Sequence, residues 1–164
     1  MFRPALPFAA ALALLAGACD RRPDDVAVVV SAIGGDATLT DPTRGDLSFA
    51  SRVMLDSTAQ GLVRFDGNGG IEPGLAERWI VIDGGRSYIF RLRDAEWPDG
   101  TAVTAADVVR SLKRAIEPRS RTAIAPFVAV IDEVVEMTPQ IVEVRLKRPR
   151  PDLLKLFAQS ELVI

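Results

Sequence analysis

The chain has 164 residues, and its 20 basic and 22 acidic side chains give a formal net charge of −2 at pH 7. The arginines are scattered among the acids and form no basic stripe, so nucleic acid is not expected as a partner. Histidine is absent and cysteine occurs once. This composition excludes a Cys/His metal site, a histidine-activated nucleophile and an internal disulfide, and we expect neither a metal nor a cofactor.

The first eighteen residues have the pattern of an export signal. Arg3 supplies a positive start, and residues 8–18 form a short apolar run that ends in small residues. This run is shorter than the roughly 20 apolar residues that a transmembrane helix needs. The sequence therefore predicts a signal peptide over residues 1–18, followed by a charged tether over residues 19–25.

The end of this segment resembles the lipobox of bacterial lipoproteins, in which the cysteine becomes the lipidated first residue. The match is Leu14-Leu15-Ala16-Gly17-Ala18-Cys19, with Ala16 where the pattern prefers leucine. Lipidation of Cys19 explains a lone thiol in an exported chain, and an ordinary signal peptide with a chance cysteine is the alternative. Asp20 resembles the signal that keeps Gram-negative lipoproteins at the inner membrane. We therefore expect a periplasmic or cell-envelope protein, anchored by lipid to the outer face of the inner membrane.

Five segments with different patterns follow the tether. Residues 26–33 are a nearly unbroken β-branched run, which favours a strand buried on both faces, and a loop rich in Gly, Asp and Thr comes next. A helix that begins at a serine or aspartate cap is predicted over residues 48–60. Residues 61–65 favour a short strand, and residues 66–70 favour a turn because they combine Asp, Asn and Gly.

The clearest β pattern is a hairpin. Strands over residues 79–82 and 88–92 flank residues 83–86, in which two glycines can adopt positive φ. Because side chains alternate along a strand, Tyr88, Phe90 and Leu92 share one face, and Arg91 lies on the other. One face of this hairpin is therefore expected to pack and the other to meet water.

A helix and a second hairpin are predicted further along the chain. Thr104 and Asp107 have the spacing of a capping box, apolar residues follow at helical spacing, and Pro118 ends the helix. Strands over residues 131–136 and 141–146 form the second hairpin, in which apolar and charged residues alternate.

The last part of the chain combines a short helix with an apolar end. The pattern predicts a helix over residues 152–158. The sequence then stops at Leu162-Val163-Ile164, and this apolar run has the pattern of a strand without a neighbour. We therefore expect a chain truncated at its C-terminus; a genuine terminal strand is the alternative.

Three stretches of the chain carry recognisable motifs. They are Gly61-Leu62-Val63 with residues 71–79 (IEPGLAERW), residues 88–93 (YIFRLR) and residues 97–108 (WPDGTAVTAADV). These stretches resemble EGLV…PGLAESW, YTFHLR and FHDGTPFTAEDV of the oligopeptide and dipeptide class of periplasmic solute-binding proteins, solute-binding family 5. The resemblance covers essentially all of the chain after the signal peptide.

The resemblance implies both a fold and a function. The fold is α/β, like that of type II periplasmic binding proteins, in which two lobes close on a solute. Residues 26–47 would begin lobe I, and residues 48–164 would form its inserted accessory domain, an α+β unit of two β-hairpins and a capped helix. The implied function is to capture peptides or a related small solute and deliver them to an ABC permease and ATPase complex.

Most motif residues have an interpretation as scaffold. They are Pro73, Gly74, Trp79, Trp97, Asp99, Gly100, Thr104 and Asp107. The Pro-Gly and Asp-Gly pairs favour turns. The two tryptophans are interpreted as core residues, and the alternative is that they face a ligand.

One binding residue is implied by the resemblance alone. In relatives that bind peptides, an acid shortly before an Asp-Pro pair resembles a partner for the amino end of the peptide. Asp36 takes that position ahead of Asp41-Pro42, and a carboxylate suits a desolvated ammonium group. An ordinary turn residue is the favoured alternative.

Two other functions remain open at the level of sequence. A lipoprotein of the same fold could act as a chaperone, a structural component or a sensor without transport. A hydrolase that needs no histidine would carry a Gly-x-Ser-x-Gly or Ser-x-x-Lys motif on a strand-to-helix turn, and none stands there. Asp132 and Glu133 are neighbours in a strand, so they are expected to point to opposite faces rather than to converge. We therefore expect a binding protein without catalytic residues.

Overall fold

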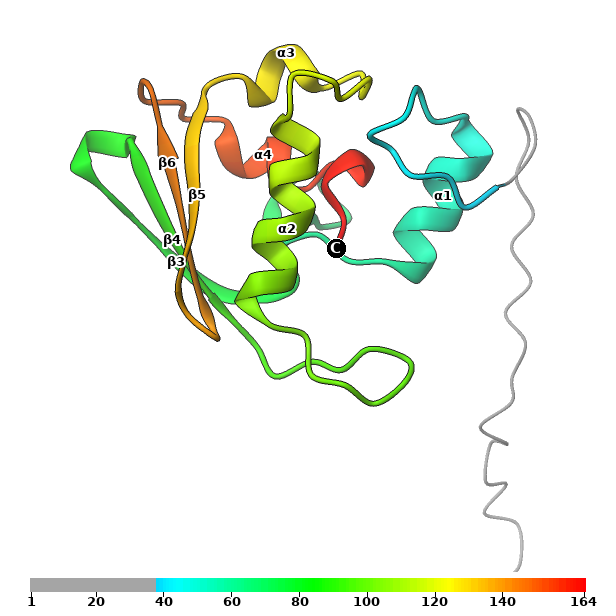
Figure 1. The fold of residues 1–164 in the computed structure, drawn as a ribbon, viewed down its shortest axis with the longest axis horizontal. Coiled ribbons are helices and arrows are strands. Elements are labelled where there is room, and N and C mark those ends of the chain that lie inside the picture. The colour runs from blue at the N-terminus through cyan, green and yellow to red at the C-terminus, as the bar shows by residue number, and fades with distance from the viewer. Residues whose placement is uncertain (1–37) are drawn as a thin grey trace, which may run out of the picture.

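The computed structural model describes residues 38–164 (Figure 1). The predictions for the signal peptide, Cys19, the tether, the strand over residues 26–33 and Asp36 lie outside the described residues. The elements in chain order are α1 (Phe49–Thr58), β1 (Val63–Phe65), β2 (Ile71–Pro73), β3 (Ala76–Ile82), the 3₁₀ turn η1 (Asp83–Gly85), β4 (Ser87–Leu92), α2 (Ala105–Ile116), α3 (Ala125–Val128), β5 (Ile131–Thr138), β6 (Ile141–Leu146), α4 (Leu153–Phe157) and the 3₁₀ turn η2 (Ser160–Leu162).

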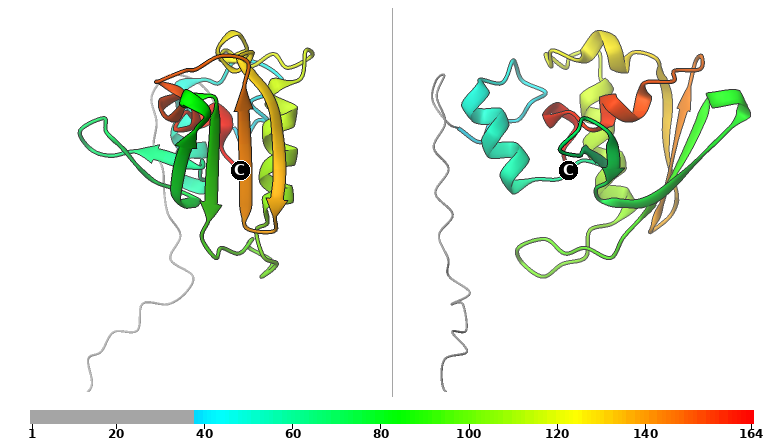
Figure 2. Two further views of the ribbon diagram at one scale, coloured as in Figure 1. Left: turned by 90° about the vertical axis from the view of Figure 1, so that its left-hand side faces the viewer. Right: turned by 180° about the vertical axis from the view of Figure 1, so that it is seen from behind.

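A four-stranded antiparallel sheet with strand order β3-β4-β6-β5 forms the centre of the fold (Figure 2). The two predicted hairpins, β3–β4 and β5–β6, are both confirmed. They join through β4 and β6, where Tyr88 lies opposite Val144 and Phe90 lies opposite Val142. The turn of the first hairpin has φ of +62° at Gly84 and +88° at Gly85, a conformation that glycine adopts without a steric penalty.

One face of the sheet packs against helices. Tyr88, Phe90 and Leu92 are buried as predicted, and Arg91 is exposed. Helix α2 covers this face beside β5 and β6, and its buried residues Ala105, Val108, Leu112 and Ala115 recur at helical spacing (Figure 1). Phe157 of α4 closes the core, because its ring meets Phe90 edge to face with 5.6 Å between centroids.

The opposite face of the sheet carries a buried polar group. Glu143 of β6 is only 7% exposed. One of its carboxylate oxygens accepts a 2.7 Å hydrogen bond from the hydroxyl of Ser87. The other accepts a bond of the same length from the guanidinium of Arg145. The bonds from Arg145 and Ser87 lower the pKa of Glu143, so this carboxylate is held in its charged form.

Helix α1 is confirmed but is built differently from the sheet region. Ser48 caps it, since the Ser48 hydroxyl accepts a 3.0 Å hydrogen bond from the Ser51 amide. Its buried side chains include Ala50 and Leu55, and neither belongs to the contiguous core cluster. Phe49 is 62% exposed, so the apolar residue at the start of this helix does not mark its buried face.

Three elements are not predicted from the sequence. Strand β2 contains Pro73, a residue that disfavours strands, yet it pairs with β1. Helix α3 is a single turn. The apolar end of the chain is not a strand as expected: Leu162 ends η2 and is 2% exposed, because its side chain packs into the core. The Ile164 amide donates a 3.0 Å hydrogen bond to the carbonyl of Gln60.

Candidate functional site

The longest motif folds into a tight turn that leads into α2. The Gly100 amide donates to the carbonyl of Trp97 at 2.8 Å, and the Trp97 amide donates to the carbonyl of Thr101 at 2.8 Å. Gly100 has φ of +82°, which explains why glycine stands there. Asp99 fixes the turn, because one carboxylate oxygen accepts from the amide and the hydroxyl of Thr101 at 2.9 and 2.7 Å. Asp99 and Gly100 are therefore turn residues, as the sequence predicts.

The capping box begins α2 as predicted. One carboxylate oxygen of Asp107 accepts from the amide of Thr104 at 2.9 Å and from its hydroxyl at 2.8 Å. The other oxygen lies 2.6 Å from the guanidinium of Arg110. The backbone bond from Thr104 is the main cause that lowers the pKa of Asp107. This carboxylate is a structural acceptor and is not suited to proton transfer near neutral pH.

Two motif glycines allow close approach of the backbone. A Cβ atom added to Gly74, which follows β2, would lie 2.5 Å from the carbonyl oxygen of Gly61. A Cβ atom at Gly61 would lie 2.7 Å from the carbonyl oxygen of Phe157. These distances are shorter than any tolerable contact, so both positions require glycine. Gly74 therefore packs on the backbone before β1, and Gly61 packs on the end of α4.

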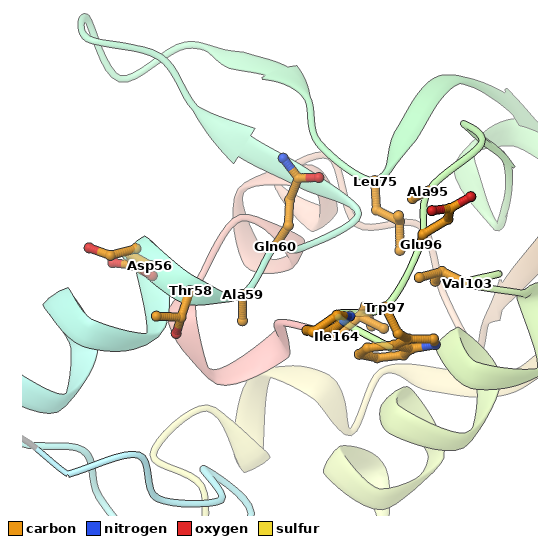
Figure 3. A pocket seen from close by; sticks show the side chains of 12 residues that line it. Asp56, Thr58, Ala59, Gln60, Leu75, Ala95, Glu96, Trp97, Val103 and Ile164 are labelled. Carbon is orange, nitrogen blue, oxygen red and sulfur yellow. The ribbon is translucent and has the colours of Figure 1, made fainter. Parts of the chain in front are cut away.

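The two motif tryptophans have different surroundings. Trp79 lies opposite Phe90 in the sheet and is half-buried against the core, in line with the interpretation favoured from the sequence. Trp97 is also half-buried, but it lines a hollow between the long turn and α1 (Figure 3).

The Trp97 hollow has a volume of about 500 Å³. It is lined by Asp56, Ser57, Thr58, Ala59, Gln60, Leu75, Ala95, Glu96, Trp97, Pro98, Val103 and Ile164. In Figure 3 the residues of α1 stand on one side, and Glu96, Trp97 and Val103 stand on the other. The hollow thus collects residues from four separate parts of the chain.

The chemistry of the Trp97 hollow favours apolar or positively charged groups. Asp56 and Glu96 are its two ionisable side chains, so its rim is negative, and no lysine or arginine lines it. Leu75, Val103 and the indole of Trp97 supply apolar surface. An indole face beside carboxylates suits an ammonium group through cation–π and Coulomb attraction.

Five of the motif residues identified from the sequence come together in the structure. Trp97, Asp99, Gly100, Thr104 and Asp107 lie in one segment. Gly100 bonds Trp97, Asp99 bonds Thr101, and Thr104 bonds Asp107. Pro73 and Gly74 lie at the β2–β3 junction, and only their neighbour Leu75 reaches the hollow.

The α1 side of the hollow was missed from the sequence. Asp56 and Gln60 belong to a segment whose patterns indicate only a helix and its end. No spacing within the chain signals that this end meets Trp97, so local patterns could not have found it.

The two neighbouring acids considered from the sequence, Asp132 and Glu133, lie at the surface of β5. Asp132 and Glu133 are both exposed beside a register shift in β5, and Glu133 is paired with Arg145 at 2.7 Å. Among residues 38–164, no group of three or more His, Cys, Asp or Glu side chains could hold a metal ion. None of the helices in this range is long and apolar enough to span a membrane.

Comparisons with known proteins agree with this fold. The family model described as bacterial extracellular solute-binding proteins, family 5 Middle, matches residues 70–164. The probable deoxycholate-binding periplasmic protein YgiS of Escherichia coli K12 is 39% identical over 95 residues, which cover 57% of this chain and 18% of YgiS. The periplasmic oligopeptide-binding protein OppA of the same strain is 37% identical over 120 residues, covering 70% of this chain and 22% of OppA.

A solved structure extends the likeness to three dimensions. The murein tripeptide binding protein MppA of Escherichia coli superposes with a TM-score of 0.67 and 29% identity, over 77% of this chain and 28% of MppA. This chain therefore spans less than a third of each of these relatives. The matched proteins are type II periplasmic binding proteins rather than enzymes. Since the family model matches more than half of the chain, the chain belongs to the bacterial extracellular solute-binding proteins of family 5.

Proposed function

We propose that the whole protein is the solute-binding lipoprotein of an ABC importer, and that it captures peptides or a related small solute for a membrane permease and its ATPase. The observation that carries this proposal is the family match over residues 70–164. OppA is named for oligopeptides and MppA for a murein tripeptide, which favours peptides as the solute class. YgiS is named for deoxycholate, so a small apolar anion is the next class to test.

We assign residues 48–164 to the accessory domain of lobe I. The order of two joined hairpins with a capped helix on one face supports this assignment. Binding proteins of this type hold a solute by closing two lobes on it. Capture is therefore a property of the whole protein, and binding experiments require the whole gene product.

Calorimetry of the whole mature protein against a library of di- to pentapeptides tests the solute class. We expect at least one peptide to bind with saturable heat and to raise the melting temperature, because a ligand that binds only the folded state stabilises it. If no peptide gives saturable heat or raises the melting temperature, and deoxycholate binds, the solute class is an apolar anion rather than a peptide. Turnover of a bound peptide would contradict a binding role altogether.

The lipid anchor is a second, separable part of the proposal. Lipidation of Cys19 would attach the mature protein to the membrane, and Asp20 favours the inner membrane. Mass spectrometry of the mature N-terminus is expected to show a diacylglyceryl cysteine at position 19. The Cys19→Ser variant should move from the membrane fraction to the soluble fraction, and its affinity for the solute should stay unchanged. An unmodified N-terminus in the wild-type protein would refute the lipid anchor but not the binding function.

We assign the motif residues around Trp97 to the scaffold. The backbone of Trp97 closes the turn on both sides, because its amide donates to Thr101 and its carbonyl accepts from Gly100. Trp97→Ala should lower the free energy of unfolding by about 3 kcal/mol, in the range for large aromatic truncations. The solute affinity of the folded fraction should stay unchanged. A selective loss of affinity at constant stability would instead make the Trp97 hollow a solute subsite.

A further inference from the structure

Four arginines surround one hollow between the C-terminal end of α2 and the loop before α1. This arginine hollow has a volume of about 470 Å³, within the range of ligand pockets. Its charged lining residues are Arg44, Arg114, Arg119 and Arg121, with the acids Asp41 and Glu117. The excess of two positive charges contrasts with the net negative chain and with the acidic rim of the Trp97 hollow.

The acid closest to the arginines is already engaged. One oxygen of Asp41 accepts from the hydroxyl of Thr43 at 2.7 Å and from its amide at 2.9 Å, and the hydroxyl bond is the main cause that lowers the pKa of Asp41. The other oxygen lies 3.9 Å from Arg44 and 4.0 Å from Arg114, at the limit of an ion pair. Asp41 therefore holds these two arginines only loosely.

The remaining two arginines, Arg119 and Arg121, have no side-chain partner among the described residues. The side chains of Arg119 and Arg121 make no hydrogen bond and no ion pair with any residue in the range 38–164. Each guanidinium carries five N–H donors in a planar fork. Two such forks thus face one hollow with their donors available.

The backbone around the arginine hollow is held in place. The Arg121 amide donates to the carbonyl of Thr43 at 2.8 Å, which ties the loop after α2 to the loop before α1. The Ser120 amide donates to the carbonyl of Glu117 at 2.9 Å and closes a turn. A ligand would thus meet two connected loops and would not need to order them, which reduces the entropic cost of binding.

We propose that the arginine hollow binds a phosphate group. A carboxylate has two oxygens and is satisfied by one guanidinium fork, whereas a tetrahedral phosphate presents enough oxygens for several forks and carries up to two charges. The negative end of the α2 dipole opposes an anion here, and Lys113 and Arg114 in the last turn of α2 offset it. The phosphate can come from a free phosphate compound or from a lipid headgroup beside the anchored protein.

This inference goes beyond the proposed import function and does not depend on the identity of the solute. Calorimetry of the whole mature protein, with Cys19→Ser to remove the anchor, measures binding of inorganic phosphate with acetate as the comparison. Flotation with vesicles of phosphatidylcholine and phosphatidic acid, against phosphatidylcholine alone, measures the lipid source. We expect saturable phosphate binding that exceeds acetate binding and weakens with added salt, since screening acts over about 8 Å at 0.15 M.

The matched variants are Arg119→Gln with Arg121→Gln, and Arg78→Gln with Arg86→Gln as a control of equal charge outside the hollow. The first pair should weaken phosphate binding by about tenfold or more, and the control should change it less than about twofold. If the protein binds phosphatidic acid vesicles but not inorganic phosphate, and if Arg119→Gln with Arg121→Gln abolishes this binding, the site is assigned to a lipid headgroup. The proposal is overturned if the protein binds neither inorganic phosphate nor phosphatidic acid vesicles, or if both pairs of variants weaken binding equally. Peptide binding is measured separately in the same preparations, so failure of the import function is distinguished from failure of this site.

Discussion

Glu143 and Glu161 are both buried, yet their surroundings differ. Glu143 lies in the sheet, and its two carboxylate oxygens accept from Ser87 and Arg145. Glu161 lies in η2 and is 3% exposed; one oxygen is paired with Arg52 of α1, and the other is buried without a hydrogen-bond partner among the described residues. The sheet region thus satisfies both oxygens of its buried carboxylate, whereas the buried carboxylate at the junction of α1 with η2 has one ion pair and one unsatisfied oxygen among the described residues.

The contrast extends to apolar packing. The sheet region has a contiguous core in which Phe90, Val142 and Val144 are fully buried. Helix α1 contributes no residue to that cluster; it buries Ala50 and Leu55 outside it, and Arg52 adds the ion pair with Glu161. Breaking a buried ion pair by removing one partner leaves an uncompensated charge, which costs more than the pair contributes. We therefore expect the two regions to fail in different ways.

The largest effect is expected in the sheet core. Phe90→Ala removes a fully buried ring that meets Phe157 edge to face, and it should lower the free energy of unfolding by about 3–5 kcal/mol. Urea unfolding measures the loss. The control is Phe49→Ala in α1, where the ring is 62% exposed and its loss should change stability by less than about 0.5 kcal/mol. Similar losses at both positions would contradict the contrast between the regions.

The next effect is expected at the junction. Arg52→Ala leaves Glu161 buried without its cation and should cost about 3 kcal/mol, at the low end of the range because the Arg52 side chain is 33% exposed. Adding Glu161→Gln should recover part of that loss, since it removes the uncompensated charge. Arg64→Ala breaks an exposed pair with Glu72 and should cost less than about 1 kcal/mol. If the two arginine variants lose equal stability, the junction does not depend on its ion pair.

The same contrast explains what the sequence could predict. The sheet and α2 follow periods of 2 and 3.6 residues, and the turns before and within them carry residues with one strong preference, such as Gly84 and Asp107. These elements are local, and their bounds lie within a few residues of the prediction. The pairing of β4 with β6 is not local, because both hairpins have the same pattern and either edge could have joined.

The candidate site was predicted only in part for a related reason. The motif turn at residues 97–101 is encoded by its own residues. The α1 wall of the Trp97 hollow and the arginine hollow are assembled from segments far apart in the chain. Arg114, Arg119 and Arg121 lie within one short segment, but Arg44 is far away in the sequence. The two loops come together only in the fold, where the Arg121 amide donates to the carbonyl of Thr43. Phe49 is exposed although it is apolar, because helix propensity does not tell which face of a helix is covered.

A smaller effect is expected from the hydrogen bond between Ser87 and Glu143 on the polar face of the sheet. Ser87→Ala removes the hydroxyl that donates to Glu143 and leaves one carboxylate oxygen without its partner, as at Glu161. The free energy of unfolding should fall by about 1–2 kcal/mol, the cost of an unsatisfied buried acceptor. Urea unfolding beside a Ser57→Ala control, whose hydroxyl is exposed, measures the difference. No loss at Ser87 would mean that Arg145 alone satisfies Glu143.

The smallest effect is the pH dependence that Glu143 confers. Its pKa in the folded protein lies below the ordinary value of 4.5, chiefly because Arg145 and Ser87 donate to the charged form. A lowered pKa means that ionised Glu143 stabilises the fold fully above about pH 4.5, and that this contribution is lost as the pH falls through the folded pKa. The stability gap between the wild-type protein and Glu143→Gln should therefore be constant near neutral pH and shrink in acid. If the difference in free energy of unfolding is equally large at acid pH, the loss in Glu143→Gln comes from packing, and the charge of Glu143 does not stabilise the sheet.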